Sequence, residues 1–510
     1  MKSIFEIFTV DTKENTLKAK INEIESWRKH KVFDEVQDEG QNYVSVRWVL
    51  TPKIIEGEMR MKARLVARGF EETTEFRTDS PTCLRESIRI VIAFIVSMKW
   101  KLHSVDYKTA FLQGNPIERE VFLRPPAEFR TKDKLWKLKK TVYGLADAPR
   151  VWFLRLKEEL EKLGAKVSSF DKGIFYWHSK SGLEGIIALF VDDQLWGGTQ
   201  NFEVQVVNKL RKIFDISYEH DTVFKYVGIE LTQHDDGSIY MCQHKYIEAI
   251  APIELENHRN VLKNEYLVPS EKRQYRGLIG QLNWVSGMSR PDIAFEVCQL
   301  STSLSSPKIK DVLRANKVVR YLKGMKTRIK VPDLGKLEKC AIWSFSDASY
   351  ANLPDGGSQG GFIVFLVNMT TFNVTPIIWK SNKVKRVVRS TLAAETLACL
   401  DGCENAFIIQ KMLNEIIGIT EKNQRPILAK TDNKSLFDTS QTTKTLADPR
   451  LRVEMGILRE MIEKGEVRVK WIESGRQLAD ALTKIGASSL NMLQVVSNGT
   501  IQIQAEEPSE

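Results

Sequence analysis

Seven acidic residues form two groups whose positions suit the binding of divalent metal ions. They are Asp106, Asp192 and Asp193 in the first half of the chain, and Asp347, Glu395, Asp432 and Asp480 in the second half. Neighbouring carboxylates resist joint ionisation, and a bound divalent cation removes that penalty. The two groups therefore predict two-metal phosphoryl-transfer sites, one for making nucleic acid and one for cutting it.

The first group fits nucleotidyl transfer at the ends of buried strands. Asp192 and Asp193 follow the apolar run 186–191, and Asp106 ends a short strand predicted over 102–105. Mg²⁺ prefers oxygen ligands, so converging carboxylates could hold one ion at a primer 3′-hydroxyl and another at a triphosphate. We predict that Asp106 and Asp192 bridge the two ions, with Asp193 beside them.

An aromatic residue and a basic strand could complete this first site. An aromatic ring at Phe111, just after Asp106, could lie under the incoming sugar and exclude a 2′-hydroxyl. The alternative is a phenylalanine of the core. Lys62, Arg64 and Arg68 are predicted to place cations on both faces of a hairpin strand, where they suit triphosphate and template-backbone contacts. The alternative is a solvated edge strand.

The second group lies in a segment with its own order of elements. Strands are predicted over 341–347, 361–367, 377–380, 427–431 and 467–472, with a long helix over 391–417. Three strands, a helix and further alternating elements are the plan of a ribonuclease H (RNase H)-like domain. Each of the four acids falls where such a fold would direct it to a shared cleft, and two ions there would activate a water.

Composition narrows the class of protein. The 510 residues carry a net charge of +10, which favours a polyanionic partner without identifying it. The six cysteines form no CxxC pair, so we expect reduced thiols rather than disulfides. The longest apolar run, 88–98, contains Arg89 and is too short to span a bilayer, so no membrane partner is expected.

Short motifs follow one another in a specific order. They are VSVRWV, KARLVARGF, DYKTAFLQG, KLWKLKKTVYGL, FVDD, FKYVGIEL, YRGLIGQLNWV, SRPDIAF, VVRYLKG, TDNKS and LADALTK. In order and spacing the chain resembles, over about residues 40–485, the Pol polyproteins of copia-type (Pseudoviridae-like) LTR retrotransposons. The resemblance implies an RNA- and DNA-directed DNA polymerase, or reverse transcriptase, followed by an RNase H that degrades the RNA of RNA–DNA hybrids.

The resemblance also implies roles for particular residues. It makes Asp106, Asp192 and Asp193 the metal ligands of the polymerase. It also implies that Tyr143 and Gly144, in the YGL motif, bind substrate. Tyr226 and Gly228 would bind substrate from a strand similar to a primer-gripping hairpin.

The implied fold is α+β and multidomain. A right-hand polymerase with fingers, palm and thumb/connection would precede an α/β RNase H-like domain. The predicted boundaries are 1–40 for a charged helical extension, 41–255 for fingers and palm, 256–338 for the helical thumb/connection, 339–490 for the RNase H-like domain and 491–510 for a disordered tail.

Cofactors and partners follow from the same resemblance. It implies two Mg²⁺ or Mn²⁺ ions in each active site. The expected partners are an RNA template, a DNA primer, an RNA–DNA hybrid, deoxynucleoside triphosphates, and the integrase and capsid parts of the same polyprotein. The expected location is a cytoplasmic virus-like particle, with nuclear entry of the product complex. The chain would be the C-terminal part of a longer polyprotein or an isolated gene remnant.

Departures from the family pattern leave a second function open. Phe190 stands where the family has tyrosine, and no histidine follows His258. Asp147 replaces a glutamine that would touch the nucleotide, and should weaken nucleotide binding unless it points away or pairs with a base such as Arg150. The alternative function is a nucleic-acid-binding relic without turnover. A DNA-only polymerase would have no reason to carry the ribonuclease module.

Overall fold

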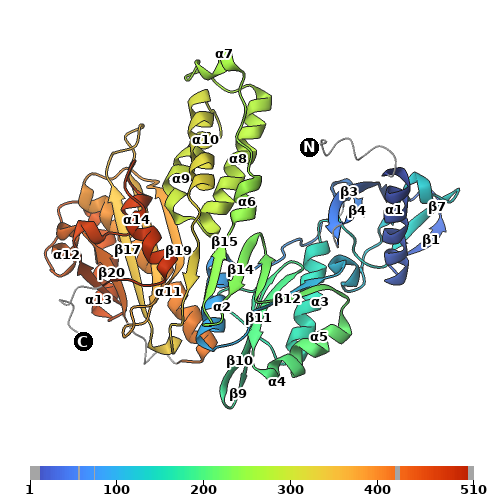
Figure 1. Cartoon of the computed structure of the whole chain (residues 1–510), viewed down its shortest axis with the longest axis horizontal. Helices are drawn as coiled ribbons and strands as arrows, with labels where there is room; N and C mark the ends of the chain where they lie inside the picture. Colours follow the sequence, from blue (N-terminus) through green and yellow to red (C-terminus); the bar gives the residue numbers. More distant parts are fainter. Residues whose placement is uncertain (1–11, 56–57, 74, 420–425, 503–510) are drawn as a thin grey trace.

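The computed structural model describes residues 12–55, 58–73, 75–419 and 426–502. In Figure 1 the amino-terminal elements lie at one end of the molecule and the RNase H-like elements at the other, with a helical arm rising between them. The described strands form five sheets. Among the described helices, none is both long and apolar enough to cross a membrane.

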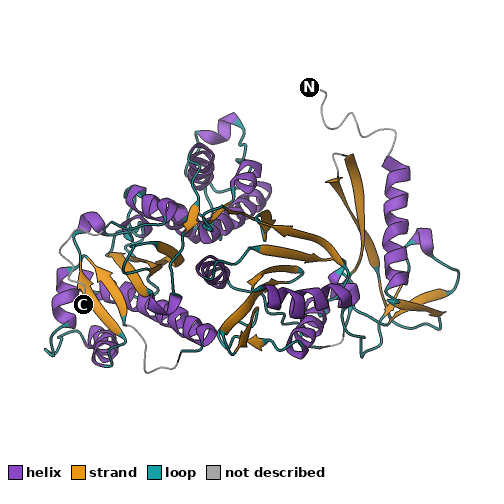
Figure 2. Ribbon diagram, turned by 60° about the horizontal axis from the view of Figure 1, so that its bottom comes forward, coloured by secondary structure: helices purple, strands orange, loops and turns teal. Residues whose placement is uncertain are grey.

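At the amino-terminal end, one helix packs against a two-stranded sheet. Trp27 of α1 and Leu65 of β4 lie in one buried cluster, and Figure 2 shows the β3–β4 hairpin beside the helix. A separate four-stranded sheet has the order β1-β7-β6-β2. The elements are α1 (Thr12–Lys29), β1 (Phe33–Gln37), β2 (Tyr43–Val44), β3 (Val46–Ile55), β4 (Glu58–Ala67), β6 (Phe122–Leu123) and β7 (Lys134–Leu138).

The central part is a six-stranded sheet, which we call the palm sheet. Its order is β12-β5-β11-β10-β9-β8, so β5 lies directly beside the β10–β11 hairpin. This neighbourhood matters because β5 carries Asp106 near its end and the hairpin carries Asp192 and Asp193. The elements are α2 (Arg85–Ser97), β5 (His103–Tyr107), α3 (Ala148–Lys162), β8 (Lys166–Val167), β9 (Ile174–Ser179), β10 (Gly182–Phe190), β11 (Asp193–Gly198), α4 (Gln200–Phe202), α5 (Asn208–Ile213) and β12 (Ile216–Asp221).

A small sheet and the helical arm follow. The sheet has the order β13-β14-β15-β16, and its last strand joins it after the chain has passed through the arm. The arm has a buried core of its own, separate from that of the palm. The elements are β13 (Val223–Tyr226), β14 (Ile229–Gln233), β15 (Ile239–Cys242), α6 (His244–Ala249), α7 (Asn257–Asn260), α8 (Pro269–Met288), α9 (Ala294–Thr302), α10 (Ile309–Gly324) and β16 (Ile329–Val331).

The carboxyl-terminal part is the predicted RNase H-like unit. Its sheet has the order β19-β18-β17-β20-β21, with β17, β20 and β21 parallel and the first three strands antiparallel. The central strand β17 is buried along its whole length, and the long helix α11 packs on it. The elements are β17 (Ala341–Ser349), β18 (Gln359–Val367), β19 (Val374–Lys383), α11 (Thr391–Ile417), β20 (Ile427–Thr431), α12 (Lys434–Ser440), α13 (Pro449–Glu463), β21 (Val467–Trp471) and α14 (Leu490–Asn498).

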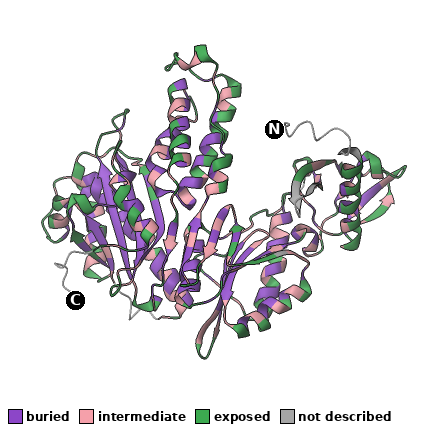
Figure 3. Cartoon of the chain, viewed as in Figure 1, coloured by how far each residue is buried: buried purple, intermediate pink, exposed green. Residues whose placement is uncertain are grey.

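Helix α2 joins the palm sheet to the carboxyl-terminal sheet. Every residue from Ser87 to Val96 is buried, and a helix that is apolar on all sides requires neighbours on all sides. It contacts β10 and β11 on the palm side and β19 on the other. One continuous hydrophobic cluster therefore extends from the palm into the RNase H-like unit, as the buried strands of both sheets indicate in Figure 3.

Arg89 is a charged residue within this apolar helix. Its guanidinium lies 3.8 Å from the centre of the Trp379 ring and donates hydrogen bonds to the carbonyl oxygens of Ile377 (2.7 Å) and Met288 (3.0 Å). Burial lowers the pKa of Arg89 to about 9. The three partners come from β19 and the end of α8, so a single side chain ties the palm helix to the arm and to the RNase H-like sheet.

Parts of the predicted boundaries differ from the structure. Residues 33–37, assigned to a helical extension, form β1, which pairs with β7 in a regular antiparallel register from Phe33 opposite Leu138 to Gln37 opposite Lys134. Residues 490–498, assigned almost wholly to a disordered tail, form α14, whose buried Met492, Leu493 and Val496 recur at helical spacing. Residues 503–510 of that tail lie outside the described part.

Replacing Arg89 by methionine should destabilise the protein by about 2–4 kcal/mol, because buried carbonyl oxygens then lose their charged donor. Arg85→Met is the matched control, since Arg85 is exposed one turn earlier on the same helix, with its guanidinium 5.3 Å from the centre of the Trp284 ring, and it should cost no more than about 1 kcal/mol. Urea unfolding followed by tryptophan fluorescence measures both. Equal stability of the two variants would show that the Arg89 bonds do not hold the units together.

Candidate active sites

The first acidic group meets at the end of the palm sheet. Asp193 lies directly opposite Asp106 in the antiparallel pair β5–β11, so both side chains are on the same face. Phe190 pairs with Asp193 across the hairpin, which leaves Val191 and Asp192 as its two-residue turn. The sequence thus brings the three predicted carboxylates to one strand end, two on neighbouring strands and one in the adjoining turn.

The turn itself holds an unfavourable backbone conformation. Val191 has φ 58°, a region that β-branched residues rarely adopt. Two hydrogen bonds hold it there: the buried Trp152 donates its Nε1–H to the Val191 carbonyl (2.8 Å), and the Tyr107 N–H donates to the Asp192 carbonyl (3.1 Å). Strain of this kind persists only where surrounding contacts enforce it, and it is typical of functional positions.

The electrostatics of this group favour a cation. Burial, followed by the neighbouring Asp192 and Asp106 charges, raises the pKa of Asp193 to about 7. Burial and the Asp106 charge likewise raise the pKa of Asp192. Ser217 donates a hydrogen bond to Asp106 (2.8 Å). Partly buried carboxylates that are costly to ionise together fit one or two divalent ions, which would supply the missing positive charge.

The predicted substrate residues surround this group in part. Phe111 meets the Tyr143 ring edge-on at 5.1 Å, and the Arg64 guanidinium lies 5.6 Å from the centre of the Tyr143 ring. Gly144 has φ 93°, and a Cβ there would come within 2.0 Å of the Ala67 carbonyl oxygen. The YGL loop therefore docks closely against the end of β4, which brings that strand's basic residues toward the palm.

The basic residues of β4 do not lie as predicted. Side chains alternate along a strand, so Lys62 and Arg64 share one face, while Ala63, Leu65 and Ala67 are buried on the other. Arg68 follows the strand and is exposed. The prediction of cations on both faces was wrong, because even-numbered positions of one strand face one way.

Asp147 is buried and fully paired, but not with the predicted base. Arg119 donates to both Asp147 oxygens, with 3.0 Å between Nη2 and Oδ1, and also to Glu72, with 3.1 Å between Nη2 and Oε2. Arg150 instead bonds to Asp79 at 2.8 Å. Asp147 is therefore buried beside a counter-ion that it shares with Glu72, which weakens the objection that it would repel a nucleotide.

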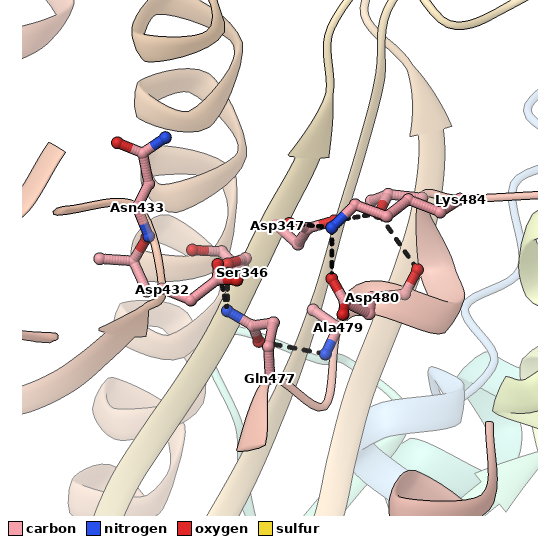
Figure 4. Close-up of polar contacts among 10 residues, drawn as sticks. Ser346, Asp347, Asp432, Asn433, Gln477, Ala479, Asp480 and Lys484 are labelled. Carbon is pink, nitrogen blue, oxygen red and sulfur yellow. Dashed lines mark hydrogen bonds and ion pairs between the residues drawn. The ribbon is translucent and has the colours of Figure 1, made fainter. Parts of the chain in front are cut away.

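The second acidic group gathers around β17, as Figure 4 shows. Asp347 on β17, Asp432 just after β20 and Asp480 in a short 3₁₀ helix have ligand oxygens within 4.8 Å of one another. No other acidic triplet among the described residues is this compact. Gly361, opposite Asp347, makes the approach possible, because a Cβ there would come within 2.6 Å of Leu482.

Glu395, the fourth predicted acid, faces the group from α11. It is buried, and its Oε2 has no hydrogen-bond partner in the described structure. Burial, then the charges of Asp347 and Asp432, raises the pKa of Glu395 to about 9. An unpartnered buried carboxylate oxygen beside three others is expensive without a cation. The four residues therefore fit a divalent metal site.

Three neighbours of this group were not predicted. Thr483 donates to Asp347, and Lys484 contacts both Asp347 (3.2 Å) and Asp480 (2.6 Å). Gln477 donates to the Ser346 carbonyl (2.9 Å) and lies 3.5 Å from Asp432. Only Lys484 left a signal in the sequence, since it follows Asp480 at the i,i+4 spacing of an ion pair.

Comparisons with known proteins agree with this geometry. Residues 30–263 match the family model described as reverse transcriptase (RNA-dependent DNA polymerase). The chain is 28% identical over 474 residues to the retrovirus-related Pol polyprotein from transposon RE1 of Arabidopsis thaliana, and 26% identical over 514 residues to that from transposon TNT 1-94 of Nicotiana tabacum. Residues 30–263 thus match the reverse transcriptase family model, and most of the chain is similar to Pol polyproteins of copia-type retrotransposons. The matches cover 86% and 95% of this chain but 30% and 38% of the relatives, so the chain spans about a third of their length.

Two solved structures share the fold of this chain. A foamy viral protease–reverse transcriptase in complex with double-stranded DNA has a TM-score of 0.56 at 12% identity, covering 90% of this chain and 69% of that one. The foamy viral enzyme in complex with an RNA/DNA hybrid has a TM-score of 0.51 at 10% identity, covering 99% and 57%. This likeness confirms the predicted fold class, a multidomain α+β polymerase.

One predicted substrate residue, Tyr226, lies in the core instead. Tyr226 is buried, and its hydroxyl donates to the Ala188 carbonyl (3.1 Å) on the strand that leads to Asp192. The predicted strand over 226–229 is a hairpin turn, with Val227 at φ 46° and Gly228 at φ 77°. Tyr226 therefore supports the catalytic hairpin from behind, and its contact with a primer is not supported by its placement.

The Arg119 pairing can be tested by substitution. Arg119→Met leaves two buried carboxylates without their shared counter-ion and should destabilise the protein by about 3 kcal/mol. Arg150 was the predicted partner of Asp147. Arg150→Met should destabilise the protein by less than about 1 kcal/mol, because Asp79, which Arg150 contacts instead, is half exposed. Urea unfolding compares the two variants. A larger loss in Arg150→Met would contradict the assignment of Arg119.

Proposed function

We propose that this chain is an RNA- and DNA-directed DNA polymerase with a second, RNase H active site. The observation that carries the proposal is the pairing of Asp106 with Asp193 beside Asp192, within a segment that belongs to the reverse transcriptase family. The compact acidic group around Asp347 supports the ribonuclease. The substrates would be an RNA or DNA template, a DNA primer, deoxynucleoside triphosphates and an RNA–DNA hybrid.

In the polymerase site, Asp106 and Asp192 would hold two Mg²⁺ or Mn²⁺ ions, with Asp193 beside them. Bound ions would lower the pKa of the primer hydroxyl and neutralise the triphosphate. Lys62 and Arg64, on one face of β4, would contact phosphates, and the docked YGL loop would fix their distance from the carboxylates. The hydrogen bonds from Trp152 and Tyr107 would keep Asp192 in its position.

In the ribonuclease site, Asp347, Glu395, Asp432 and Asp480 would hold two further ions. Bound ions would activate a water and stabilise the leaving 3′-oxygen. The 2′-hydroxyls and the A-like shape of the hybrid would select the RNA strand. The foamy viral relative that shares this fold is bound to an RNA/DNA hybrid, which supports the same substrate class here.

The wider setting follows from the family. The chain would work within a virus-like particle in the cytoplasm, beside integrase and capsid parts of a longer polyprotein, and its product complex would enter the nucleus. The relatives that carry this inference are Pol polyproteins, and the chain matches about a third of their length.

Two substitutions should separate the activities. Asp192→Asn should lower primer extension on an RNA template by about three orders of magnitude and leave hybrid cleavage unchanged, and Glu395→Gln should do the reverse. Both activities should require Mg²⁺ or Mn²⁺ and stop in EDTA. Asp235→Asn, at an exposed carboxylate, is the control. Salt-sensitive template binding with no turnover in the unmutated chain would instead support the relic.

Phe111→Ala should relax sugar selection at the polymerase site. Without the ring, a ribonucleotide 2′-hydroxyl meets no obstacle, so ribonucleotide incorporation relative to deoxyribonucleotide should rise by about tenfold or more. Single-nucleotide extension measures the ratio, and Phe170→Ala, at an exposed ring away from the acids, is the control. An unchanged ratio with normal extension would assign Phe111 to the core alone.

A further inference from the structure

Lys484 places a positive charge inside the acidic group of the RNase H-like unit. Its Nζ lies 3.2 Å from Asp347 Oδ1 and 2.6 Å from Asp480 Oδ1, and Figure 4 shows it between the two side chains. Asp347 and Asp480 are two of the three acids whose oxygens lie within 4.8 Å of one another. The ammonium group therefore binds two of the carboxylates that a divalent ion would need.

The contact is strong enough to compete with a cation. The Asp347 side chain is 1% exposed, so its charge is poorly solvated and its attraction to Lys484 is weakly screened. Thr483 donates to the other Asp347 oxygen, so the two residues together occupy both oxygens of that carboxylate.

The contact can also be broken at modest cost. The Lys484 side chain is 40% exposed and the Asp480 side chain 29% exposed, so the ammonium group can turn toward solvent. Lysine has four rotatable side-chain bonds and a compact charge that water solvates well. An ammonium group and a divalent ion on the same oxygens would repel each other, so the two occupancies exclude one another.

We propose that Lys484 is an internal counter-ion of the ribonuclease site, which neutralises Asp347 and Asp480 until a divalent ion displaces it. The inference rests on the proposed ribonuclease function and concerns how its metal site fills. Only the fraction of molecules in which Lys484 has left the acids binds metal at full strength, so the residue lowers the apparent metal affinity. It also stabilises the metal-free fold, because the acids would otherwise repel each other.

The test measures metal binding rather than cleavage. Isothermal titration of the full chain with Mn²⁺ should show binding about tenfold tighter or more at the ribonuclease site in Lys484→Met than in the unmutated chain. The metal-free Lys484→Met protein should melt at a lower temperature, and Mn²⁺ should restore more of the loss. Asp347→Asn identifies which part of the isotherm belongs to this site.

A matched control exists on α13. Lys464 forms an i,i+4 ion pair with Glu460 at 2.6 Å, the same spacing and distance as the pair of Lys484 with Asp480, but on an exposed surface. Lys464→Met removes the same charge and should leave Mn²⁺ affinity within about twofold. Lys484→Arg keeps the charge and should also leave the affinity near that of the unmutated chain.

Each result of these titrations tests either the counter-ion role of Lys484 or the proposed metal site. Unchanged or weaker Mn²⁺ binding in Lys484→Met would overturn the counter-ion role, and weaker binding would make Lys484 a residue that positions the ligands. Should Lys484→Met fail to fold, Lys484→Gln gives the same comparison with a polar side chain of similar length. If Asp347→Asn removes no binding at all, the metal site of the proposed ribonuclease fails, whatever Lys484 does.

Discussion

The burial of α2 between two sheets is the constraint on which the rest of this structure depends. One face of the helix packs against the β10–β11 hairpin that carries Asp192 and Asp193, and the other against β19 of the RNase H-like unit. Arg89 then bonds to backbone carbonyls of the neighbouring elements. The relative position of the two acidic groups is thus fixed by a packed core and a buried charge, not by the length of a connecting segment.

The two acidic groups face the same electrostatic problem and meet it differently. In the palm, a turn with Val191 at positive φ is held by a tryptophan and a backbone N–H, and the carboxylates keep raised pKa values. In the RNase H-like unit, Lys484 neutralises part of the charge and Thr483 donates a hydrogen bond to Asp347, while Glu395 retains an unpartnered oxygen. The first site relies on backbone geometry and the second on side-chain partners.

Much of this arrangement could be predicted from the sequence, since local pattern determines it. Asp106, Asp192 and Asp347 follow or lie within apolar strands. An acidic residue at the end of an apolar strand indicates a candidate metal site even when the tertiary contacts are not known. The order of strands around a long apolar helix likewise predicts the RNase H-like fold.

What escaped prediction depends on contacts between distant segments. Asp147 pairs with Arg119, 28 residues earlier in the chain, while the nearby Arg150 turns to Asp79. The partner of a buried charge is chosen by tertiary packing, which a single sequence does not display. Tyr226 was misplaced for the same reason, because a strand residue in a matching motif can face either the cleft or the core.

The shared core around α2 has a consequence for how the protein can be divided. A fragment ending before β17 would lack β19. The side of α2 that packs against β19, and the side of Arg89 that faces Trp379, would then be open to water. An apolar surface of that kind promotes self-association, so a fragment ending before β17 should aggregate. Any rearrangement that keeps only one of the two sheets must supply a new cover for this helix.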